Sequence, residues 1–242
     1  MIHSVFPGSI RFVLLLIIFV FAGTSPAKAD KNNKFEINIA RFTGPGGAYL
    51  RSASNEWDKH NIAGARQLLD AAIKADKELW PAYFMRGQAW WLLGKNQLAL
   101  QDINEAARLK PQFTRTFIIR AQILQELGRC TEALADLNQV IKIRSTPQSL
   151  AFALNRRAAL HINCRNTAIY DPRKALEDAT NAYNLDGLAI YLDTLAFAHA
   201  VNGDFDSAIQ CEKKAIASGR LDADELKRAQ GRLASFERRK NP

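Results

Sequence analysis

The stretch RGQAWWLLGKNQLALQDINEAARLKP, residues 86–111, decides the fold of this chain. It reads as two helical segments separated by Gly94, because glycine readily takes the left-handed backbone conformation that ends a helix. Two small residues of the second segment, Ala99 and Ala106, lie two helical turns apart and therefore on one face. A neighbouring helix can approach closely along such a face. The stretch therefore predicts a helix–turn–helix hairpin that needs a packing partner.

The same arrangement recurs along most of the chain, which indicates a repeat protein. Small residues of the first helices are 34 positions apart in the first two intervals and slightly more in the others: Ala53, Gly87, Ala121, Ala158 and Ala196. The second helices carry an alanine 12 positions later, or 17 in the fourth copy: Ala65, Ala99, Ala133, Ala175 and Ala208. Between the helices stands Gly94, Gly128 or Gly203, and His60 takes this place in the first copy. Because one hairpin cannot bury its apolar face alone, we expect the copies to stack around a continuous core.

The repeated unit resembles the tetratricopeptide repeat family. Residues 82–111 (AYFMRGQAWWLLGKNQLALQDINEAARLKP) and 191–217 (YLDTLAFAHAVNGDFDSAIQCEKKAIA) carry small residues and a turn glycine in the spacing of this family. The resemblance implies an all-α, right-handed solenoid of about five helix–turn–helix units over residues 46–220. The expected units are 46–79, 80–113, 114–147, 148–186 and 187–220. In such a solenoid the first helices line a concave groove.

Residues 221–242 predict an amphipathic capping helix with a short tail. Leu226, Leu233 and Phe236 fall on one side of this helix, and charged residues fall elsewhere. Such a helix can cover the last apolar face of a solenoid while presenting a polar outside. Its basic residues would also suit a helix at a membrane surface, but interspersed acidic residues favour the cap.

The first 29 residues, 1–29, read as a secretory signal peptide. Arg11 precedes an apolar run over residues 12–22, and Ala27-Lys28-Ala29 has the small–x–small form of a cleavage site. The run rises only about 16 Å as a helix, roughly half of a hydrocarbon core, so we expect no stable membrane span after cleavage. The prediction is an exported protein, periplasmic or secreted. The absence of an Asn-x-Ser/Thr sequon favours a bacterial periplasm.

The chain of 242 residues is basic, with a formal net charge of +9. In a cytosolic protein this excess would raise the question of nucleic acid as a partner. Export removes that partner, so no nucleic acid is predicted and the charge is interpreted as a solvated basic surface.

Three cysteines would mature in an oxidising compartment. Cys130 begins a second helix and Cys164 lies in the insertion of the fourth unit, on the same edge of the solenoid that the resemblance implies. We favour a disulfide between these two, with Cys211 packing as a small apolar residue. The pattern His161-x-x-Cys164 lacks a second pair of ligands, so no metal and no cofactor is predicted.

An arginine and an aspartate also repeat with the hairpins. The arginine precedes the small residue of the first helix, and the aspartate follows the alanine of the second: Arg86 with Asp102, Arg120 with Asp136, and Arg157 with Asp178. Units one and five lack both members, as expected of a direct pair, because loss of one partner would leave a partly buried charge unpaired. We predict structural ion pairs between helices. A row of anion-binding arginines is the alternative.

The adjacent tryptophans raise the question of a binding surface. In the implied solenoid Trp90 packs between helices, while Trp91 points about 100° away, toward the groove. The groove is predicted to carry Trp57, Phe84, Gln88, Trp91, Ile118, Gln122 and Gln125. Exposed together, these side chains would form an apolar patch large enough to indicate a protein ligand. The alternative is that the superhelix or the N-terminal segment covers them.

Residues 30–45 are predicted to form an extended N-terminal segment. Phe35, Ile37 and Ile39 alternate along it, so residues 30–48 could lie in the groove. Family members that clamp the terminal carboxylate of a peptide use Lys, Asn and Arg at fixed groove positions. The Lys and Asn positions are filled by other residue types here, so we expect any bound peptide to be recognised through apolar side chains.

No catalytic motif is found, whether HExxH, GxSxG, a P-loop or a dinucleotide fingerprint. Because the repeats occupy most of the mature chain, the sequence predicts a non-enzymatic scaffold or adaptor of the cell envelope. Its partner would be a peptide or protein segment bound in the groove. The alternative is a structural subunit of an envelope assembly. A homo-oligomer is possible but is not indicated.

Overall fold

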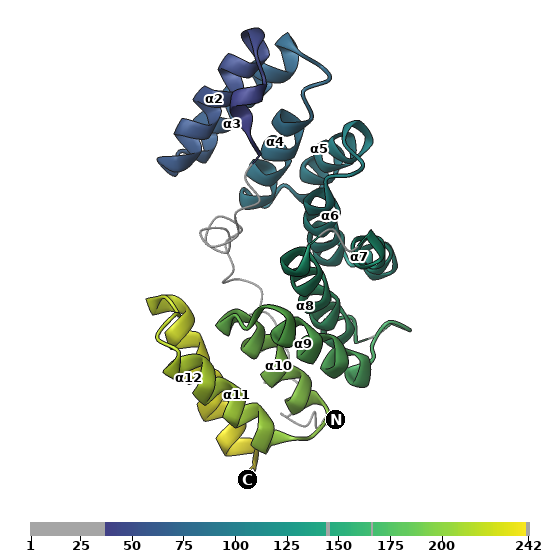
Figure 1. Ribbon diagram of the computed structural model, residues 1–242, viewed down its shortest axis with the longest axis vertical. Coiled ribbons are helices and arrows are strands. Elements are labelled where there is room, and N and C mark those ends of the chain that lie inside the picture. The colour runs from purple at the N-terminus through teal and green to yellow at the C-terminus, as the bar shows by residue number, and fades with distance from the viewer. Residues whose placement is uncertain (1–36, 144–145, 166, 241–242) are drawn as a thin grey trace, which may run out of the picture. The chain divides into compact units, whose positions relative to one another are not determined.

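The computed structural model describes residues 37–143, 146–165 and 167–240. These residues form eleven α-helices and one short 3-10 helix, with no strand among them (Figure 1). In chain order the elements are η1 (Ile39–Arg41), α2 (Gly44–Asp58), α3 (Ile62–Ala75), α4 (Trp80–Leu92), α5 (Asn96–Leu109), α6 (Thr114–Glu126), α7 (Cys130–Ile143), α8 (Pro147–Asn163), α9 (Pro172–Asp186), α10 (Ala189–Val201), α11 (Phe205–Ala217) and α12 (Ala223–Lys240). The predicted all-α fold of five helical hairpins and a final helix is confirmed.

The hairpin turns follow the predicted residues. Gly94, Gly128 and Gly203 have φ angles of 69°, 74° and 87°, which only glycine adopts without strain. His60 takes the same position in the first hairpin with φ of 63°, an uncommon conformation for a residue with a side chain. The fourth turn is longer and ends at Asp171, which caps α9 by accepting a hydrogen bond from Lys174 N at 3.0 Å.

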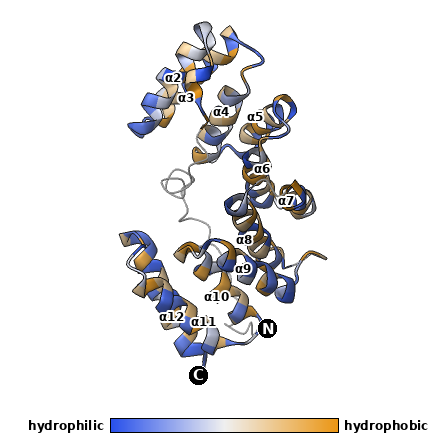
Figure 2. Cartoon of the chain, in the orientation of Figure 1, coloured by the Kyte–Doolittle hydropathy of each residue, from blue (hydrophilic) through white to orange (hydrophobic). Residues whose placement is uncertain are grey.

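Small residues bring the two helices of each hairpin together. The repeated alanines of the second helices are buried: Ala65, Ala99, Ala133, Ala175 and Ala208. The small residues seven positions after them are buried as well: Ala72, Ala106, Val140, Ala182 and Ala215. In α4, a Cβ atom added to Gly87 would lie 2.8 Å from Ile103 Cδ1 on α5, so even alanine would require Ile103 to shift. Apolar and polar residues alternate along the helices (Figure 2), as expected where one face of each packs inward.

Each hairpin also packs against the next one. The second helices α3, α5, α7 and α9 contact the first helices α4, α6, α8 and α10 that follow them. The first helices α4, α6, α8 and α10 contact one another in the same order. The core is therefore continuous from repeat to repeat, as stacked hairpins require.

The last helix, α12, packs against α11. It buries Ala229 and Phe236, and the Phe236 ring meets Phe197 of α10 edge-on, with ring centroids 5.7 Å apart. Leu233 packs against the same cluster. The apolar side predicted for this helix thus covers the last hairpin.

The N-terminal segment differs from the predicted extended conformation over residues 30–45. Residues 39–41 form a 3-10 turn, and α2 begins at Gly44, two residues before the predicted start of the solenoid. The first reason is local: Pro45 occupies the first turn of α2, where its fixed φ favours a helix start. Residues 30–36 of the predicted segment lie outside the described residues.

The second reason is packing. Ile39 and Phe42 are three residues apart, and the turn lets both contact the core of the first hairpin. Gly47 permits this approach, because a Cβ atom there would lie 1.9 Å from the carbonyl oxygen of Phe42.

None of the described helices is both long and apolar enough to cross a bilayer. The predicted signal peptide, residues 1–29, lies outside the described residues.

Candidate functional site

The candidate site is the first-helix face, defined by the seven residues predicted to line a groove. They come from α2, α4 and α6 and occupy three positions that recur every 34 residues. The first position holds Phe84 and Ile118, the second holds Gln88 and Gln122, and the third holds Trp57, Trp91 and Gln125.

Three of the seven are buried, which corrects the prediction of an exposed patch. Phe84, Gln88 and Ile118 expose only 3%, 8% and 4% of their surface. Phe84 packs edge-on against Phe113, with ring centroids 5.3 Å apart, and Ile118 lies in a cluster with Val140. Successive hairpins approach so closely that these positions fall between helices. These three side chains therefore belong to the core.

A row of aromatic rings joins the N-terminal turn to the second unit. Phe42 meets Trp80 at 6.3 Å, Trp80 meets Phe113 at 4.7 Å, and Phe113 meets Phe84. Edge-on and tilted pairs of this kind stabilise beyond the area they bury. Ile37 packs against the cluster that contains Phe84, so the N-terminal segment contributes to covering this part of the face.

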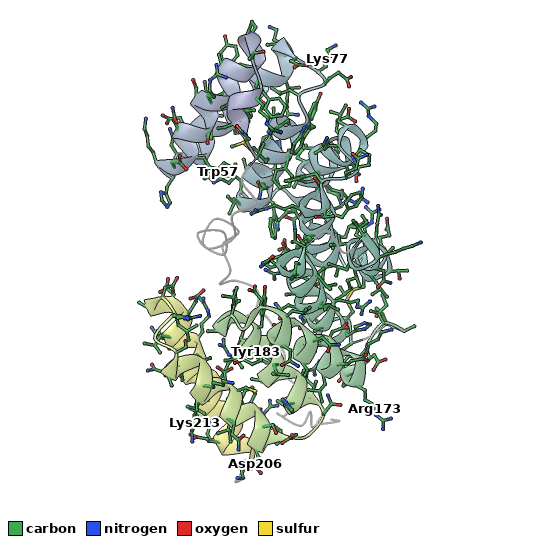
Figure 3. The ribbon with its side chains drawn as sticks, viewed as in Figure 1. Trp57, Lys77, Arg173, Tyr183, Asp206 and Lys213 are labelled. Carbon is green, nitrogen blue, oxygen red and sulfur yellow. A yellow bond between two sulfur atoms is a disulfide. The ribbon has the colours of Figure 1, made fainter. Side chains whose placement is uncertain are left out.

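Four of the seven are half-buried and form the accessible part of the face: Trp57, Trp91, Gln122 and Gln125. Trp57 lies near the C-terminal end of α2 (Figure 3), and Trp91 holds the equivalent position on α4. Trp91 rests against the core through part of its ring system. Trp90 also packs on that core, beneath the guanidinium of Arg66 at 4.9 Å.

The structure brings together each predicted arginine and aspartate. Arg86 Nε and Nη2 donate to the two carboxylate oxygens of Asp102, each at 2.7 Å. The other two pairs share this geometry at 2.6 to 2.8 Å: Arg120 with Asp136, and Arg157 with Asp178. All three aspartates are buried. The hydrogen bond to Asp102 raises the pKa of Arg86, so this guanidinium remains charged.

Sequence reasoning missed a third member of each pair. The remaining Nη1 group reaches back to the preceding unit, from Arg86 to Asp70 at 2.9 Å, from Arg120 to Asn104 at 3.1 Å and from Arg157 to Asn138 at 2.7 Å. These acceptors recur every 34 residues, so they could have been found in the sequence by following the repeat period. Each guanidinium is occupied by protein acceptors on two sides, which favours the structural role over an anion-binding row.

The fifth unit lacks this pair, and α12 supplies a different polar contact. Arg232 Nε donates to Glu212 at 2.7 Å, and Arg232 Nη2 lies 2.7 Å from Asp193. Glu212 is fully buried, and its Oε2 has no hydrogen-bond partner among the described residues. Burial and the nearby Asp193 raise the pKa of Glu212 to about 7. Burial likewise raises the pKa of Asp193.

Cys130 and Cys164 form a disulfide, with their Cα atoms 6.4 Å apart. It joins the start of α7 to the end of α8. His161 Nδ1 lies 2.7 Å from the carbonyl oxygen of Ile169, within the inserted turn. Over the described ranges, no group of three or more His, Cys, Asp or Glu side chains is arranged to hold a metal ion. Cys211 is half-buried and packs against the apolar core of the fifth unit.

Comparison with known sequences relates the second hairpin to a known family. Residues 81–113 match the family model described as tetratricopeptide repeat. DnaJ homolog subfamily C member 3 of Rattus norvegicus is 28% identical over 145 residues, covering 56% of this chain and 26% of that protein. Protein STIP1 homolog of Dictyostelium discoideum is 30% identical over 133 residues, covering 55% of this chain and 23% of that protein. The chain thus spans about a quarter of the length of these relatives.

Solved structures share the fold. A thermophilic tetratricopeptide-repeat protein of Thermus thermophilus aligns with a TM-score of 0.63 and 18% identity, over 79% of this chain and 98% of the other. MamA of Desulfovibrio magneticus RS-1 aligns with a TM-score of 0.56 and 18% identity, over 78% and 98%. PilF of Pseudomonas aeruginosa aligns with a TM-score of 0.63 and 15% identity, over 79% and 88%. The chain is therefore an α-solenoid of stacked helical hairpins. Its second hairpin, residues 81–113, is similar in sequence to a tetratricopeptide repeat.

Proposed function

We propose that this protein is a non-enzymatic scaffold that binds a segment of another protein on its first-helix face. The observation that carries the proposal is the placement of Trp57 and Trp91. They hold equivalent positions in consecutive repeats, and both are only half-buried. Tryptophan offers a large apolar area and loses few conformations on binding, which is why it anchors protein contacts.

The rest of the accessible face fits an extended or helical segment. Gln122 and Gln125 continue it along α6 with amide groups, which can both donate and accept hydrogen bonds. Stacked helical repeats generally bind partners along such extended surfaces. The burial of Phe84, Gln88 and Ile118 narrows the site, so the contact would be centred on the two tryptophans.

We further propose that the protein works in an oxidising compartment outside the cytoplasm, as a periplasmic or secreted adaptor. Two observations support this location. The leading residues 1–29 have the composition of a signal peptide. The disulfide between Cys130 and Cys164 is of a kind that persists in exported proteins and is rare in the cytosol. Mass spectrometry of the native protein tests both observations. A mature N-terminus near residue 30 would show cleavage of the signal peptide, and cysteines that can be alkylated only after reduction would show the disulfide.

The binding proposal is tested with Trp57→Ala and Trp91→Ala in a pull-down from periplasmic extract, followed by affinity measurement with the captured partner. We expect each change to weaken binding by about thirtyfold, the loss typical of an interface anchor. Leu98→Ala is the matched control, because Leu98 is 41% exposed but lies on the second helix α5. Circular dichroism should show unchanged helicity in all three. Binding that survives both tryptophan changes would show that the first-helix face is not the site.

A further inference from the structure

Two adjacent arginines on α8 have different surroundings. Arg157 donates to both oxygens of Asp178 and to Asn138. Arg156 points about 100° around the helix from it. Among the described residues, no carboxylate pairs with Arg156, and the only titratable group that acts on its charge is Tyr191.

Arg156 instead faces a residue of the first-helix face. With its amide oxygen turned toward α8, Gln122 places that oxygen over the face of the Arg156 guanidinium, 3.2, 3.0 and 3.1 Å from Nε, Nη1 and Nη2. The ring of Phe152, one turn earlier on α8, lies 4.9 Å from the guanidinium carbon. One amide oxygen and one aromatic face orient the guanidinium, but they neither neutralise its charge nor occupy all its donors.

A second polar group near this point lacks a partner. Asn155 is 6% exposed, and its Oδ1 accepts no hydrogen bond from the described residues. Asn155 stands three residues before Ala158, as Ile118 stands three before Ala121. At this repeat position the residue therefore changes from apolar on α6 to polar on α8.

The energetics of Arg156 favour an anion from outside the described chain. Its guanidinium is partly buried, and burial lowers its pKa to about 10, which still leaves it charged at neutral pH. A desolvated charge without a counter-ion destabilises a fold unless a partner compensates it. A carboxylate is the partner whose two oxygens match the planar guanidinium, as Asp178 does for Arg157 one residue away.

We propose that Arg156, oriented by Gln122, receives the side-chain carboxylate of an aspartate or glutamate in the bound partner. This inference rests on the proposed function and adds the chemistry of the partner, which would be apolar against the tryptophans and acidic opposite α8. The excess of basic over acidic residues, which remains after residues 1–29 are removed, complements an acidic segment. A side-chain carboxylate is preferred to a terminal one because the Lys and Asn positions of a terminal-carboxylate clamp hold residues such as Phe84, Ile118 and Gln122.

The test is a selection from random dodecapeptides displayed between fixed flanks, so that no terminal carboxylate is free. Selection on the wild-type protein should enrich one aspartate or glutamate beside aromatic or aliphatic residues. Synthetic copies with blocked termini are then measured by fluorescence anisotropy. Arg156→Met should weaken binding about tenfold or more, the worth of one charge-assisted hydrogen bond. Changing the acidic residue of the peptide to its amide should weaken binding by the same factor. Combining this change with Arg156→Met should cause little further loss of affinity.

Arg173→Met is the matched control, because Arg173 is an exposed arginine on α9 (Figure 3). This substitution removes the same charge at a different place on the surface. A stability measurement separates recognition from packing. Arg156→Met should unfold at the wild-type temperature or above it, whereas Arg157→Met should unfold at a lower temperature. A clear fall in the unfolding temperature of Arg156→Met would make it a structural residue and overturn the inference.

The remaining outcomes distinguish this inference from the proposed function. Peptides that need Trp57 and Trp91 but show no acidic preference would overturn the inference alone. Acidic peptides that bind the Arg156→Met protein as well as the Arg173→Met control would do the same. Binding that ignores both tryptophans would overturn the proposed function as well.

Discussion

At the scale of the residue, Arg86, Arg120 and Arg157 show how one side chain couples two hairpins. Each divides its donors between an aspartate of its own hairpin and an acceptor of the previous one. A buried ion pair adds little stability over an apolar pair of the same size, because desolvation offsets the attraction. Loss of one partner, however, leaves a buried charge. The three arginines are therefore best understood as fixing the register of neighbouring hairpins.

The contact between α12 and the fifth hairpin predicts a pH dependence of stability. The pKa of Glu212 is raised from 4.5 to about 7 in the folded chain, so folding retains a proton that the unfolded chain would release. This stabilising contribution is complete below pH 4.5 and is lost as the pH rises through 7. Asp193, whose pKa is also raised, acts in the same direction. Between about pH 5 and 8 the free energy of unfolding should fall by on the order of 1–3 kcal/mol.

Thermal unfolding in a series of buffers measures this slope. Glu212→Gln keeps the shape of the side chain and removes the titration, so its unfolding temperature should change less over the same range. Glu177→Gln, on the exposed surface of α9, is the control and should keep the wild-type slope. If the Glu212 variant follows the wild type at every pH, the buried carboxyl is not the source of the dependence.

At the scale of the element, the hairpins could be predicted because their determinants are local and periodic. A glycine at three of the five hairpin turns and small residues seven apart specify where helices end and where they touch. The burial of Phe84, Gln88 and Ile118 could not be predicted in this way, because it depends on how closely one hairpin approaches the next. The turn at residues 39–41 was missed for a related reason, since packing of Ile39 and Phe42 replaced the alternation of an extended chain.

The disulfide is an element-scale feature with a large expected effect on stability. It joins residues 34 apart in sequence, and closing a loop of that length contributes about 3–4 kcal/mol in the chain-entropy treatment. The double change Cys130→Ala with Cys164→Ala should lower the urea midpoint accordingly, and reduction of the wild type should give the same shift. Cys211→Ala serves as the control, because it keeps the disulfide and its midpoint should fall on reduction as that of the wild type does. A reduced wild type as stable as the oxidised one would contradict the expectation.

At the scale of the whole solenoid, the contacts run between sequential neighbours. Each hairpin packs on the one before it and the one after it, and α12 packs on the last. Stability in such an array is close to a sum of repeat and interface contributions, so a local change should propagate with decreasing strength. The arginines that bridge neighbouring hairpins extend this coupling as far as the fourth unit. At the fifth unit, Arg232 of α12 makes the corresponding polar contact with Glu212.

Removal of α12 tests this behaviour. A chain that ends at Leu221 loses the contacts of Phe236 and Arg232, and it exposes the apolar cluster around Ala208 and Ile209. Hydrogen exchange should become faster throughout α10 and α11, less so in α8 and α9, and remain at the wild-type rate in α4 and α5. Phe236→Ala should produce the same gradient more weakly, since deletion of a buried phenylalanine ring costs about 3–5 kcal/mol. A uniform acceleration of hydrogen exchange from α2 to α11 would instead show that the repeats unfold as one cooperative unit. The contacts of Arg86, Arg120 and Arg157 would then transmit more free energy between hairpins than neighbour packing alone.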